Sequence, residues 1–548
     1  MNPFNATHRD QLISKLNETH YDLIVIGGGV TGAGIVLDAS ARGLKCALVE
    51  KNDFASGTSS KSTKLIHGGL RYLKQFEIAL VQEVGSERAV VHKLAPHLVR
   101  AEKMLLPLIK DGTYGKILTS LGLMAYDVLA GVENADQRVM LTKEETLQKE
   151  PLLDESILEG GGLYAEYRTD DARLTIEILK TAALMGADII NYAEATDFIY
   201  KQGKVAGVLW KDQFTGLGQS ISSDYVISAT GPWVDEMREK NKSLSGKHLH
   251  LTKGVHIVVP HEKFPVRQSV YFDVPDGRMI FAIPRDRVTY IGTTDTDYSG
   301  NINEVRTNME DVAYLLDGVK HIFPDIQLSV SDVESSWAGL RPLIEEEGKS
   351  ASQLSRKDEI FESESGLFSI AGGKLTGYRK MAERIVDRLI KKLDGKRKKV
   401  LNPCQTEKVI LTGGFFKNGE GVDQYINEIT KIVSSKGLDK YYASYLVGNY
   451  GRQSNQILQL FDHRKEKDPE IRLALSELDY CIENEAVHTL LDFFERRTGR
   501  VNFNIGTIPK LIDPVSNHLA DIHHWNKNRK KEELAKLDKG LKIASEFL

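Results

Sequence analysis

Three glycines and one glutamate near the start of the sequence have the spacing of a dinucleotide-binding site. Gly27, Gly29 and Gly32 form a G-x-G-x-x-G pattern, and Glu50 follows the third glycine by 18 residues. The first glycine permits a tight turn, the second lets the backbone approach a pyrophosphate, and the third lets a helix pack closely on a strand. Since a carboxylate at this distance can accept hydrogen bonds from ribose hydroxyls, the pattern predicts a bound dinucleotide.

The segments around these residues are the ones that such a site requires. Asp22–Ile26 and Cys46–Val49 are short apolar runs typical of buried strands, and a helical pattern between them ends near Arg42. The N-terminus of this helix would present unpaired N–H groups and a partial positive charge to phosphates. An ordinary glycine-rich turn is the alternative, but the strand–turn–helix–strand context and the acidic end favour the dinucleotide site.

Two other stretches could contact a flat or phosphorylated ligand. Residues 56–64 are rich in Ser, Thr and Gly, which suits close approach of the backbone to a ligand. His67 and Arg71 follow at i, i+4 spacing and share one face if the segment is helical, although a solvated basic helix start is the alternative. The small residues 229–231 end an apolar strand and offer a second close approach to the cofactor.

Three further candidates have plainer alternatives. His256 alternates with apolar residues in a strand, where an ordinary core histidine is the simpler interpretation. Arg341 follows a Gly-Leu pair that we interpret as a turn. Gly372-Gly373-Lys374 at a helix start resembles a phosphate loop, but Leu375 replaces the required Ser or Thr, and a Walker-type nucleotide triphosphatase is therefore excluded.

The composition limits the classes of protein to which the chain can belong. The chain has 548 residues, 41% of them hydrophobic, and a net charge of −4, which favours two or three globular domains and gives no nucleic-acid footprint. Cys46, Cys404 and Cys481 lie far apart, so we expect neither a disulfide scaffold nor a metal site, and a reducing cytoplasm fits. We expect no secretory signal and no membrane-spanning segment.

The remaining patterns predict a strand-rich region over residues 251–296, helices over 73–103 and 308–321, and a largely helical region beyond the basic run 391–399. Residues 105–130 carry an apolar stripe at helical spacing that could lie in a membrane interface. A core-facing helix of a second domain is the alternative for this stripe. The basic C-terminal 25 residues favour a solvated helix.

Six motifs in one order make the chain resemble the FAD-dependent glycerol-3-phosphate dehydrogenases. In sequence order they are IGGGVTGAGI, SSKSTKLIHGGLRYL, KGVHIVVP, IGTTDT, GLRPL and GGKLTGYRK. Six motifs in register are far more specific than any one of them, and the match covers nearly the whole chain from about Tyr21. The wider superfamily, with D-amino-acid and glycine oxidases, resembles the chain in its flavin fold but does not share the HGGLRY and GGKLT pair.

The resemblance implies an α/β fold with a Rossmann-type FAD-binding domain, an antiparallel-sheet substrate domain like that of glucose and D-amino-acid oxidases, and a helical C-terminal domain. The implied boundaries are 20–80, 155–250 and 330–395 for the FAD-binding domain, 81–154 and 251–329 for the substrate domain, and 400–548 for the helical domain.

The resemblance also implies an activity. Members of the family oxidise sn-glycerol 3-phosphate to dihydroxyacetone phosphate by hydride transfer to FAD, and bacterial members pass the electrons to membrane quinone while bound peripherally to the inner face of the cell membrane. Alternatives are a related flavin oxidase using O2, an amine or amino-acid oxidase, and a non-catalytic flavoprotein module. The compact region 255–330 and the lack of a calcium-loop motif favour the bacterial dehydrogenase type.

Such a reaction needs a phosphate clamp, a proton acceptor and a group near the flavin. Arginine suits the clamp, lysine can offset charge at the flavin, and histidine titrates near the working pH. The catalytic candidates are His67, His256, Arg341 and Lys374, with His256 favoured as the partner of the substrate hydroxyl. The substrate-binding candidates are Arg71, Tyr72, His256, Thr294, Arg341 and Lys374.

By resemblance, the cofactor-binding candidates are Gly27, Gly28, Gly29, Gly32, Glu50, Lys51, Thr58, Ser59, Ser62, Lys64, Leu65, His67, Ala229, Gly231, Gly339, Lys374, Leu375 and Thr376. The general base, the docking site of the acceptor and the oligomeric state stay open, with a homodimer as one option.

Overall fold

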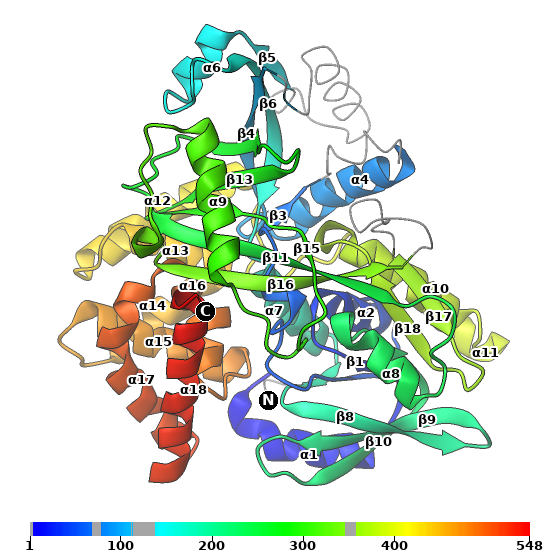
Figure 1. Cartoon of the computed structure of the whole chain (residues 1–548). Coiled ribbons are helices and arrows are strands. Elements are labelled where there is room, and N and C mark those ends of the chain that lie inside the picture. The colour runs from blue at the N-terminus through cyan, green and yellow to red at the C-terminus, as the bar shows by residue number, and fades with distance from the viewer. Residues whose placement is uncertain (1–3, 68–77, 111, 113–137, 346–357, 548) are drawn as a thin grey trace.

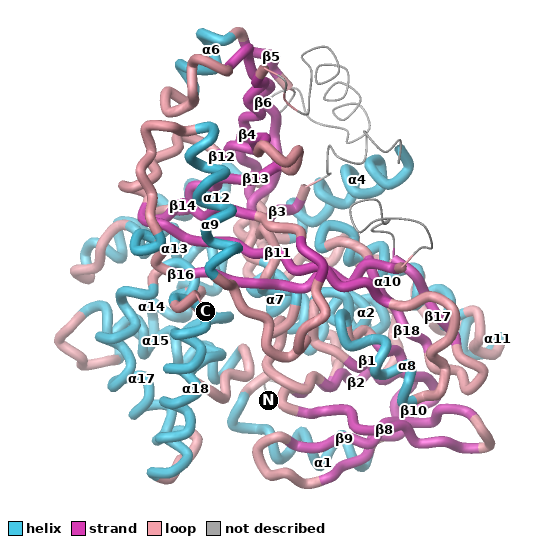
Figure 2. The backbone as a smooth tube through the Cα atoms, in the orientation of Figure 1, coloured by secondary structure: helices cyan, strands magenta, loops and turns pink. Residues whose placement is uncertain are grey.

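A parallel sheet forms the centre of the first of three structural units. The computed structural model describes residues 4–67, 78–110, 112, 138–345 and 358–547 (Figures 1 and 2). The strands of this first sheet are β1 (His20–Ile26), β2 (Cys46–Val49), β7 (Asp188–Ile190), β8 (Ala193–Lys201), β9 (Lys204–Asp212), β10 (Gly218–Ser228), β17 (Asp358–Glu362) and β18 (Phe368–Gly372). β18, β10, β1, β2 and β7 run parallel in that order, while β8 and β9 form an antiparallel meander with β10. This is the Rossmann-type arrangement, in which ligands bind at the carboxyl ends of the strands.

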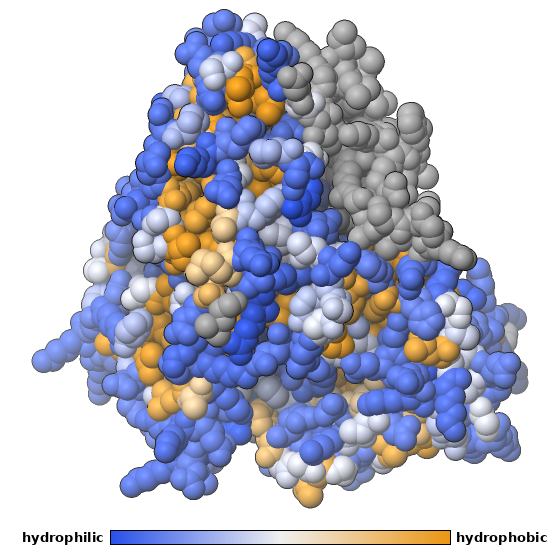
Figure 3. Space-filling view, in the orientation of Figure 1, coloured by the Kyte–Doolittle hydropathy of each residue, from blue (hydrophilic) through white to orange (hydrophobic). Residues whose placement is uncertain are grey.

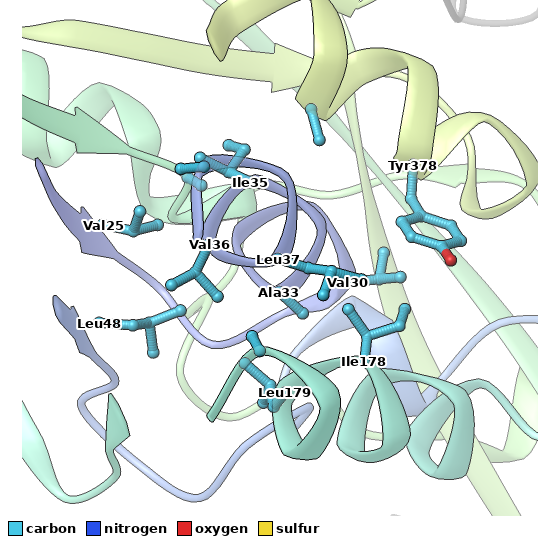
Figure 4. Packing of buried hydrophobic residues seen from close by; sticks show 14 of the residues in the cluster. Val25, Val30, Ala33, Ile35, Val36, Leu37, Leu48, Ile178, Leu179 and Tyr378 are labelled. Atoms are coloured by element: carbon cyan, nitrogen blue, oxygen red, sulfur yellow. The ribbon is translucent and has the colours of Figure 1, made fainter. Parts of the chain in front are cut away.

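Helices cover one face of the first sheet. α2 (Val30–Ala41) lies between α7 (Asp171–Leu184) and α10 (Tyr378–Ile390), and its apolar side chains pack with those of β1 and β2 (Figure 4). Along β1, Leu23 and Val25 belong to this cluster, whereas the alternate residues Ile24 and Ile26 pack on the other face with the meander. The two-residue period of the strand thus supplies both layers of the core.

A second, mostly antiparallel sheet stands beside the first. Its strands are β3 (Leu65–Ile66), β4 (Arg100–Ile109), β5 (Val139–Leu141), β6 (Leu158–Arg168), β11 (Leu249–Pro260), β12 (Ser269–Asp273), β13 (Met279–Arg285), β14 (Val288–Gly292), β15 (Thr296–Asp297) and β16 (Ser335–Ile344). α9 (Met309–Ile322) buries Val312, Leu315 and Val319 in the cluster that this sheet forms. The end of the sheet made by β4, β5 and β6, with α6 (Lys143–Lys149), projects from the body of the molecule (Figure 1).

The C-terminal region is helical, as its sequence pattern predicts. Its helices are α12 (Gly419–Ser435), α13 (Tyr441–Tyr450), α14 (Ser454–His463), α15 (Pro469–Asn484), α16 (Arg500–Phe503), α17 (Ile508–Ile522) and α18 (Lys527–Ser545). The other helices are α1 (Arg9–Glu18), α4 (Ile78–Leu94), α8 (Val234–Lys240) and α11 (Gly395–Lys398). α18 is not simply a solvated helix, because it buries Leu537 and Ala544, and Ser336 of β16 donates a hydrogen bond to the carbonyl oxygen of Ala544.

A buried group of charges joins the helical region to the loop that follows β2. Asp53 accepts two hydrogen bonds from Arg497, at 2.6 and 2.9 Å, and a third from Nε of Arg496 at 2.5 Å. The Asp53 carboxylate and the Arg497 guanidinium are fully buried. Both arginines come from the π-helical segment Asp492–Arg497. The first and last thirds of the chain are therefore held together by ionic hydrogen bonds shielded from water.

Several sequence-based expectations differ from the structure. The helix predicted over 73–103 ends at Leu94, because Pro96 stops it, and the chain continues as β4. Arg341 lies inside β16 and not after a turn, since cross-strand pairing with β11 extends the backbone through Gly339. The Gly372–Gly373 pair is a turn with positive φ angles, and the helix begins only at Tyr378.

Sheet membership also shifts the expected domain limits. β6 lies within 155–250 and β16 within 330–395, ranges expected for the cofactor domain, yet both strands belong to the second sheet. β6 pairs with β4 and β16 with β11 along their whole lengths, and this pairing fixes their place. None of the helices within the described ranges has the length and hydrophobicity needed to traverse a bilayer.

Candidate active site

A cavity of about 300 Å³ lies where the two sheets meet. Its walls come from the glycine-rich turn after β1, the loop 50–63, the turn after β10, the facing strands β11 and β16, and residues 370–376. A second cavity of about 430 Å³ adjoins it and shares Lys51, Trp233 and Gly339. The glycine-rich turn and a group of cationic and imidazole side chains thus line the same space.

The glycine-rich turn forms a close backbone cradle. Gly27 has a φ of +110°, and a Cβ atom there would lie 2.5 Å from the carbonyl oxygen of Ala229. At Gly32 a Cβ atom would lie 1.9 Å from the carbonyl oxygen of Gly27, so only glycine lets α2 pack here. Gly29 is the N-cap of α2 and leaves the N-terminus of this helix without a side-chain cap of its own. This geometry fits the pyrophosphate of a dinucleotide.

Glu50 stands at the end of β2 and lines the cavity. Its carboxylate accepts hydrogen bonds from the backbone N–H of Gly28 at 2.6 Å and of Asn52 at 2.9 Å. Burial raises the pKa of Glu50, although these two donors oppose the effect. The carboxylate is fixed in place and keeps acceptor capacity for ribose hydroxyls. Gly28 does not line the cavity. Its N–H group donates to Glu50, and a Cβ atom on it would point at the ring of Phe54.

Hydroxyl groups fasten the loop 56–64 to its surroundings. Thr58 donates to the carbonyl oxygen of Leu340 at 2.8 Å, Ser59 accepts from the N–H of Val30 at 2.9 Å, and Ser62 donates through N and Oγ to Asp171. Lys64 does not reach the cavity. Its side chain is buried behind the loop, where Nζ donates to Asp171 at 2.5 Å and to the carbonyl oxygen of Ser60 at 3.0 Å. Lys64 therefore supports the loop and is not placed to bind the cofactor.

His256 lines the same cavity, in a buried aromatic setting. Its ring stacks on Trp337 with centroids 5.0 Å apart, and Nε2 lies 3.0 Å from the hydroxyl of Thr63. Nδ1 has no hydrogen-bond partner among the described residues. Burial lowers the pKa of His256 well below its ordinary value, and the charges of Arg341 and Lys64 add to this effect. The imidazole is neutral at pH 7 and can therefore accept a proton.

Arg341 projects beside His256 and is held in a fixed orientation. Nη1 donates to Asp295 at 2.9 Å, and Nη2 donates to the hydroxyl of Thr293 at 2.8 Å and to the carbonyl oxygen of Thr294 at 3.1 Å. Gly254, which lies diagonally across from it on β11, leaves room for the guanidinium, since a Cβ atom there would lie 2.3 Å from Nη2. A pre-oriented guanidinium suits a phosphate or carboxylate ligand.

The cavity is also lined by Lys374, Leu375, Thr376 and His67. Gly372 and Gly373, with φ angles of +75° and +83°, turn the chain so that Lys374 follows directly on β18. The hydroxyl of Thr376 donates to the carbonyl oxygen of His67 at 3.3 Å, which ties the two segments together. His67 packs edge-on against Phe281 of the second sheet.

The structure brings together most of the predicted site residues. Those that line the cavity are Gly27, Gly29, Glu50, Lys51, Thr58, Ser59, Ser62, Leu65, His67, Ala229, Gly231, His256, Gly339, Arg341, Lys374, Leu375 and Thr376. Thr294 does not line it, because its hydroxyl is buried in hydrogen bonds with the backbone of Val255 and Lys253. Arg71 and Tyr72 lie outside the described residues.

Thr63 and Lys61 also line the cavity, and Trp337 stacks on His256; none of the three was predicted. A signal for Trp337 was present in the sequence. Residues 337, 339 and 341 alternate along one strand and thus face the same side, and they pair across with His256, Gly254 and Thr252. Thr63 and Lys61 carried no comparable signal, because their roles depend on contacts with distant β-strands.

Comparisons with known proteins agree with this geometry. Residues 22–378 match the FAD dependent oxidoreductase family, and residues 404–530 match the C-terminal domain of alpha-glycerophosphate oxidase. The chain is 46% identical over 539 residues to the aerobic glycerol-3-phosphate dehydrogenase of Bacillus subtilis (strain 168), covering 98% of this chain and 97% of that protein. The corresponding protein of Staphylococcus haemolyticus (strain JCSC1435) is 47% identical over 531 residues, covering 96% of this chain and 95% of that protein.

A solved structure extends the comparison to the fold. The glycerol-3-phosphate dehydrogenase from Bacillus halodurans complexed with FAD superimposes with a TM-score of 0.85 at 44% identity, covering 100% of this chain and 99% of that chain. The predicted fold class, with its Rossmann-type domain, antiparallel-sheet domain and helical C-terminal domain, is confirmed. The chain thus belongs to the FAD-dependent oxidoreductase family, within its glycerol-3-phosphate dehydrogenase branch.

Proposed function

We propose that the chain oxidises sn-glycerol 3-phosphate to dihydroxyacetone phosphate with FAD as its bound cofactor and passes the electrons to membrane quinone. The observation that carries the proposal is that Arg341, His256 and Lys374 line the same cavity as the glycine-rich turn. The cradle at Gly27 and Gly32, which leaves no space for a Cβ atom, fits the dinucleotide part of FAD. When bound, FAD supplies the acceptor for the hydride from C2 of the substrate.

Arg341 is the proposed anchor of the substrate phosphate. Because Asp295 and Thr293 already fix its guanidinium, little side-chain entropy is lost when an anion binds. Binding the phosphate at this point places the remote end of a three-carbon substrate and so aims C2 at the flavin. Arg71 is proposed as the second arm of the clamp, from the sequence alone.

His256 is the proposed acceptor of the C2 hydroxyl proton. The ring is neutral, and its stacking on Trp337 and its contact with Thr63 hold it in one orientation. A bound phosphate dianion would offset the charge of Arg341, one of the groups that lower the pKa of His256. Substrate binding would therefore make His256 a stronger base at the moment when one is required. Lys374 is proposed to balance negative charge that develops at the reduced cofactor.

Anaerobic titration tests this function. We expect sn-glycerol 3-phosphate to bleach the visible flavin band of the purified holoenzyme under argon, because hydride transfer reduces the flavin, whereas glycerol and amino acids should leave the band unchanged. Reoxidation by a soluble quinone without stoichiometric peroxide would identify quinone as the acceptor. A flavin band that the phosphorylated substrate does not bleach would contradict the proposal, and bleaching by amino acids would point to an oxidase.

Peripheral contact with the inner face of the membrane, in part through residues 105–130, belongs to the same proposal. The neighbouring arm of β4, β5 and β6 supports it, because Val139 of β5 is 52% exposed and hydrophobic side chains gather over β5 and β6 (Figure 3). Apolar side chains on such a tip gain free energy by entering the boundary between headgroups and acyl chains.

Vesicle flotation measures this contact. We expect the full-length protein to float with anionic phospholipid vesicles, and we expect the fraction that floats to fall severalfold when Ile117, Leu121 and Val128 are all replaced by Ser, because less apolar surface is buried. The control is Val400→Ser, which changes an exposed valine in the linker before the helical region. Equal flotation of the triple variant and this control would rule out residues 105–130 as the contact.

A further inference from the structure

A separate cavity of about 340 Å³ lies where the second sheet, the start of α7 and helix α13 meet. It shares no lining residue with the flavin cavity. Its walls include Arg285 at the end of β13, Thr169 before α7, His97 after α4, and Tyr441 and Gly448 on α13. The volume is within the range of cavities that bind small organic ligands.

Polar atoms of three side chains around this cavity lack hydrogen-bond partners among the described residues. Nη1 of Arg285, Oγ1 of Thr169 and both ring nitrogens of His97 have no hydrogen-bond partner among the described residues. Thr169 and His97 are 3% and 1% exposed. A buried polar group that is left unpaired costs about 1–3 kcal/mol, so three such groups around one cavity indicate a ligand that completes their hydrogen bonds.

The guanidinium of Arg285 is held in position without being saturated. Nη2 donates to Asp170 at 3.0 Å, and the guanidinium carbon lies 3.8 Å from the ring centroid of Phe503. The rest of the side chain is thus fixed while Nη1 is left without a partner among the described residues. A guanidinium fixed by a carboxylate and an aromatic face is a common way of presenting donors to an oxyanion.

The other charges and donors fit the same class of ligand. Arg100, Arg168 and Arg287 also line the cavity, but they pair with Asp423, Glu102 and Glu334, so Arg285 is the arginine that offers a nitrogen without a partner among the described residues. Burial raises the pKa of Tyr441 to about 12, with a further contribution from Asp286, so its hydroxyl stays protonated and can donate. Arginine, threonine and tyrosine donors suit the oxygens of a phosphate group.

We infer that this cavity is a second binding site, which takes inorganic phosphate or a small phosphate monoester in contact with Arg285 and Thr169. The site has a direct route to the flavin loop. Asp170, the partner of Arg285, caps α7, and the next residue, Asp171, accepts the hydrogen bonds of Ser62 and Lys64. An anion that competes with Asp170 for Arg285 therefore acts on the segment that holds one wall of the flavin cavity.

Equilibrium dialysis of the full-length holoenzyme with radiolabelled inorganic phosphate tests this site. Phosphate can also occupy the proposed substrate clamp, so the measurement is made in an Arg341→Ala background. We expect this variant to retain one saturable phosphate site per chain. Gly448→Leu, added to it, should abolish that binding by filling the cavity, because a Cβ atom at Gly448 meets no atom within 4 Å and a longer side chain can extend into the space.

Gly448→Ala is the matched control, since it adds only one carbon and favours the helix by about 1 kcal/mol; it should bind phosphate like the parent. Arg285→Gln, as an independent change, should weaken phosphate binding at least about tenfold, the loss expected for one ionic hydrogen bond. The flavin spectrum reports that each variant is folded. Absence of saturable binding in the Arg341→Ala protein, or binding that Gly448→Leu leaves unchanged, would overturn the inference.

Discussion

Replacing Arg341 by alanine is expected to lower kcat/KM for sn-glycerol 3-phosphate by about 10³-fold, or about 4 kcal/mol, which is the scale for losing a charged partner in a partly buried site. Both constants should change. KM rises because the phosphate loses its anchor, and kcat falls because phosphate binding also positions the reacting carbon. The measurement is steady-state kinetics with a soluble quinone, together with the rate of flavin bleaching in single turnover.

Two further variants test whether the effect depends on the hydrogen-bond geometry of Arg341. Arg341→Lys keeps the charge but cannot reproduce the hydrogen bonds to both Asp295 and Thr293, so it should recover only part of the loss. Arg306→Ala removes an exposed arginine that pairs with Glu304 and should leave the kinetics unchanged. Unchanged kinetics in Arg341→Ala would remove this residue from the clamp, whatever the flavin content of the variant.

Replacing Arg497 by methionine is expected to lower the free energy of unfolding by about 3–5 kcal/mol at pH 7, the usual cost of breaking a buried ion pair. The side chain is fully buried and donates to Asp53 and to the carbonyl oxygen of Glu485. Methionine fills much of the volume, so the loss reports on the charge and not on a cavity. Thermal and urea unfolding, followed by flavin fluorescence, measure the change.

The same variant has a distinctive pH dependence. Burial disfavours the charged form of Asp53, but Arg497 and Arg496 outweigh it and lower the pKa of Asp53 to about 2. The folded pKa is below the unfolded value of about 4, so the stabilisation is complete above about pH 4 and is lost as the pH falls toward about 2. The difference in stability between wild type and Arg497→Met should therefore be largest near neutral pH and shrink in acid.

The control for this experiment is Arg388→Met, which removes an arginine that is 48% exposed and pairs with Glu362. It should change stability by less than about 1 kcal/mol at any pH. If Arg497→Met were no less stable than Arg388→Met, or if their difference did not depend on pH between about 2 and about 4, the buried pair would not hold the two regions together.

Local pattern was sufficient to predict much of the fold. β2 was predicted to the residue, and β1, α2 and α9 were placed within a few residues, because each has a strong apolar pattern or a capping residue of its own. The errors arose where pairing with a distant strand decides the conformation. β4 was taken as helix and β16 as a turn because their partners, β6 and β11, are far away in the sequence.

The site divides in the same way. The glycine-rich turn and Glu50 were predicted from their spacing alone. His256 and Arg341 were predicted from the chemistry of their side chains and from the motifs in which they lie. The sequence pattern did not indicate that Lys64 and Thr294 lie outside the cavity lining, since their buried partners Asp171 and Val255 cannot be recognised from spacing. The ionic contact between Asp53 and Arg497 could not be predicted from the sequence either, because each residue alone is typical of a surface loop.

The contact between Asp53 and Arg497 has a consequence for how the protein is made. The two residues are 444 positions apart, and Asp53 leaves the ribosome when its partner has not yet been synthesised. Until translation is nearly complete, the nascent loop beside Glu50 carries a carboxylate that must stay hydrated, and it cannot settle into its final, dry position. The loop beside Glu50 can therefore reach its final environment only after Arg497 has been synthesised, and we expect the pocket that this loop helps to form to be completed late in folding.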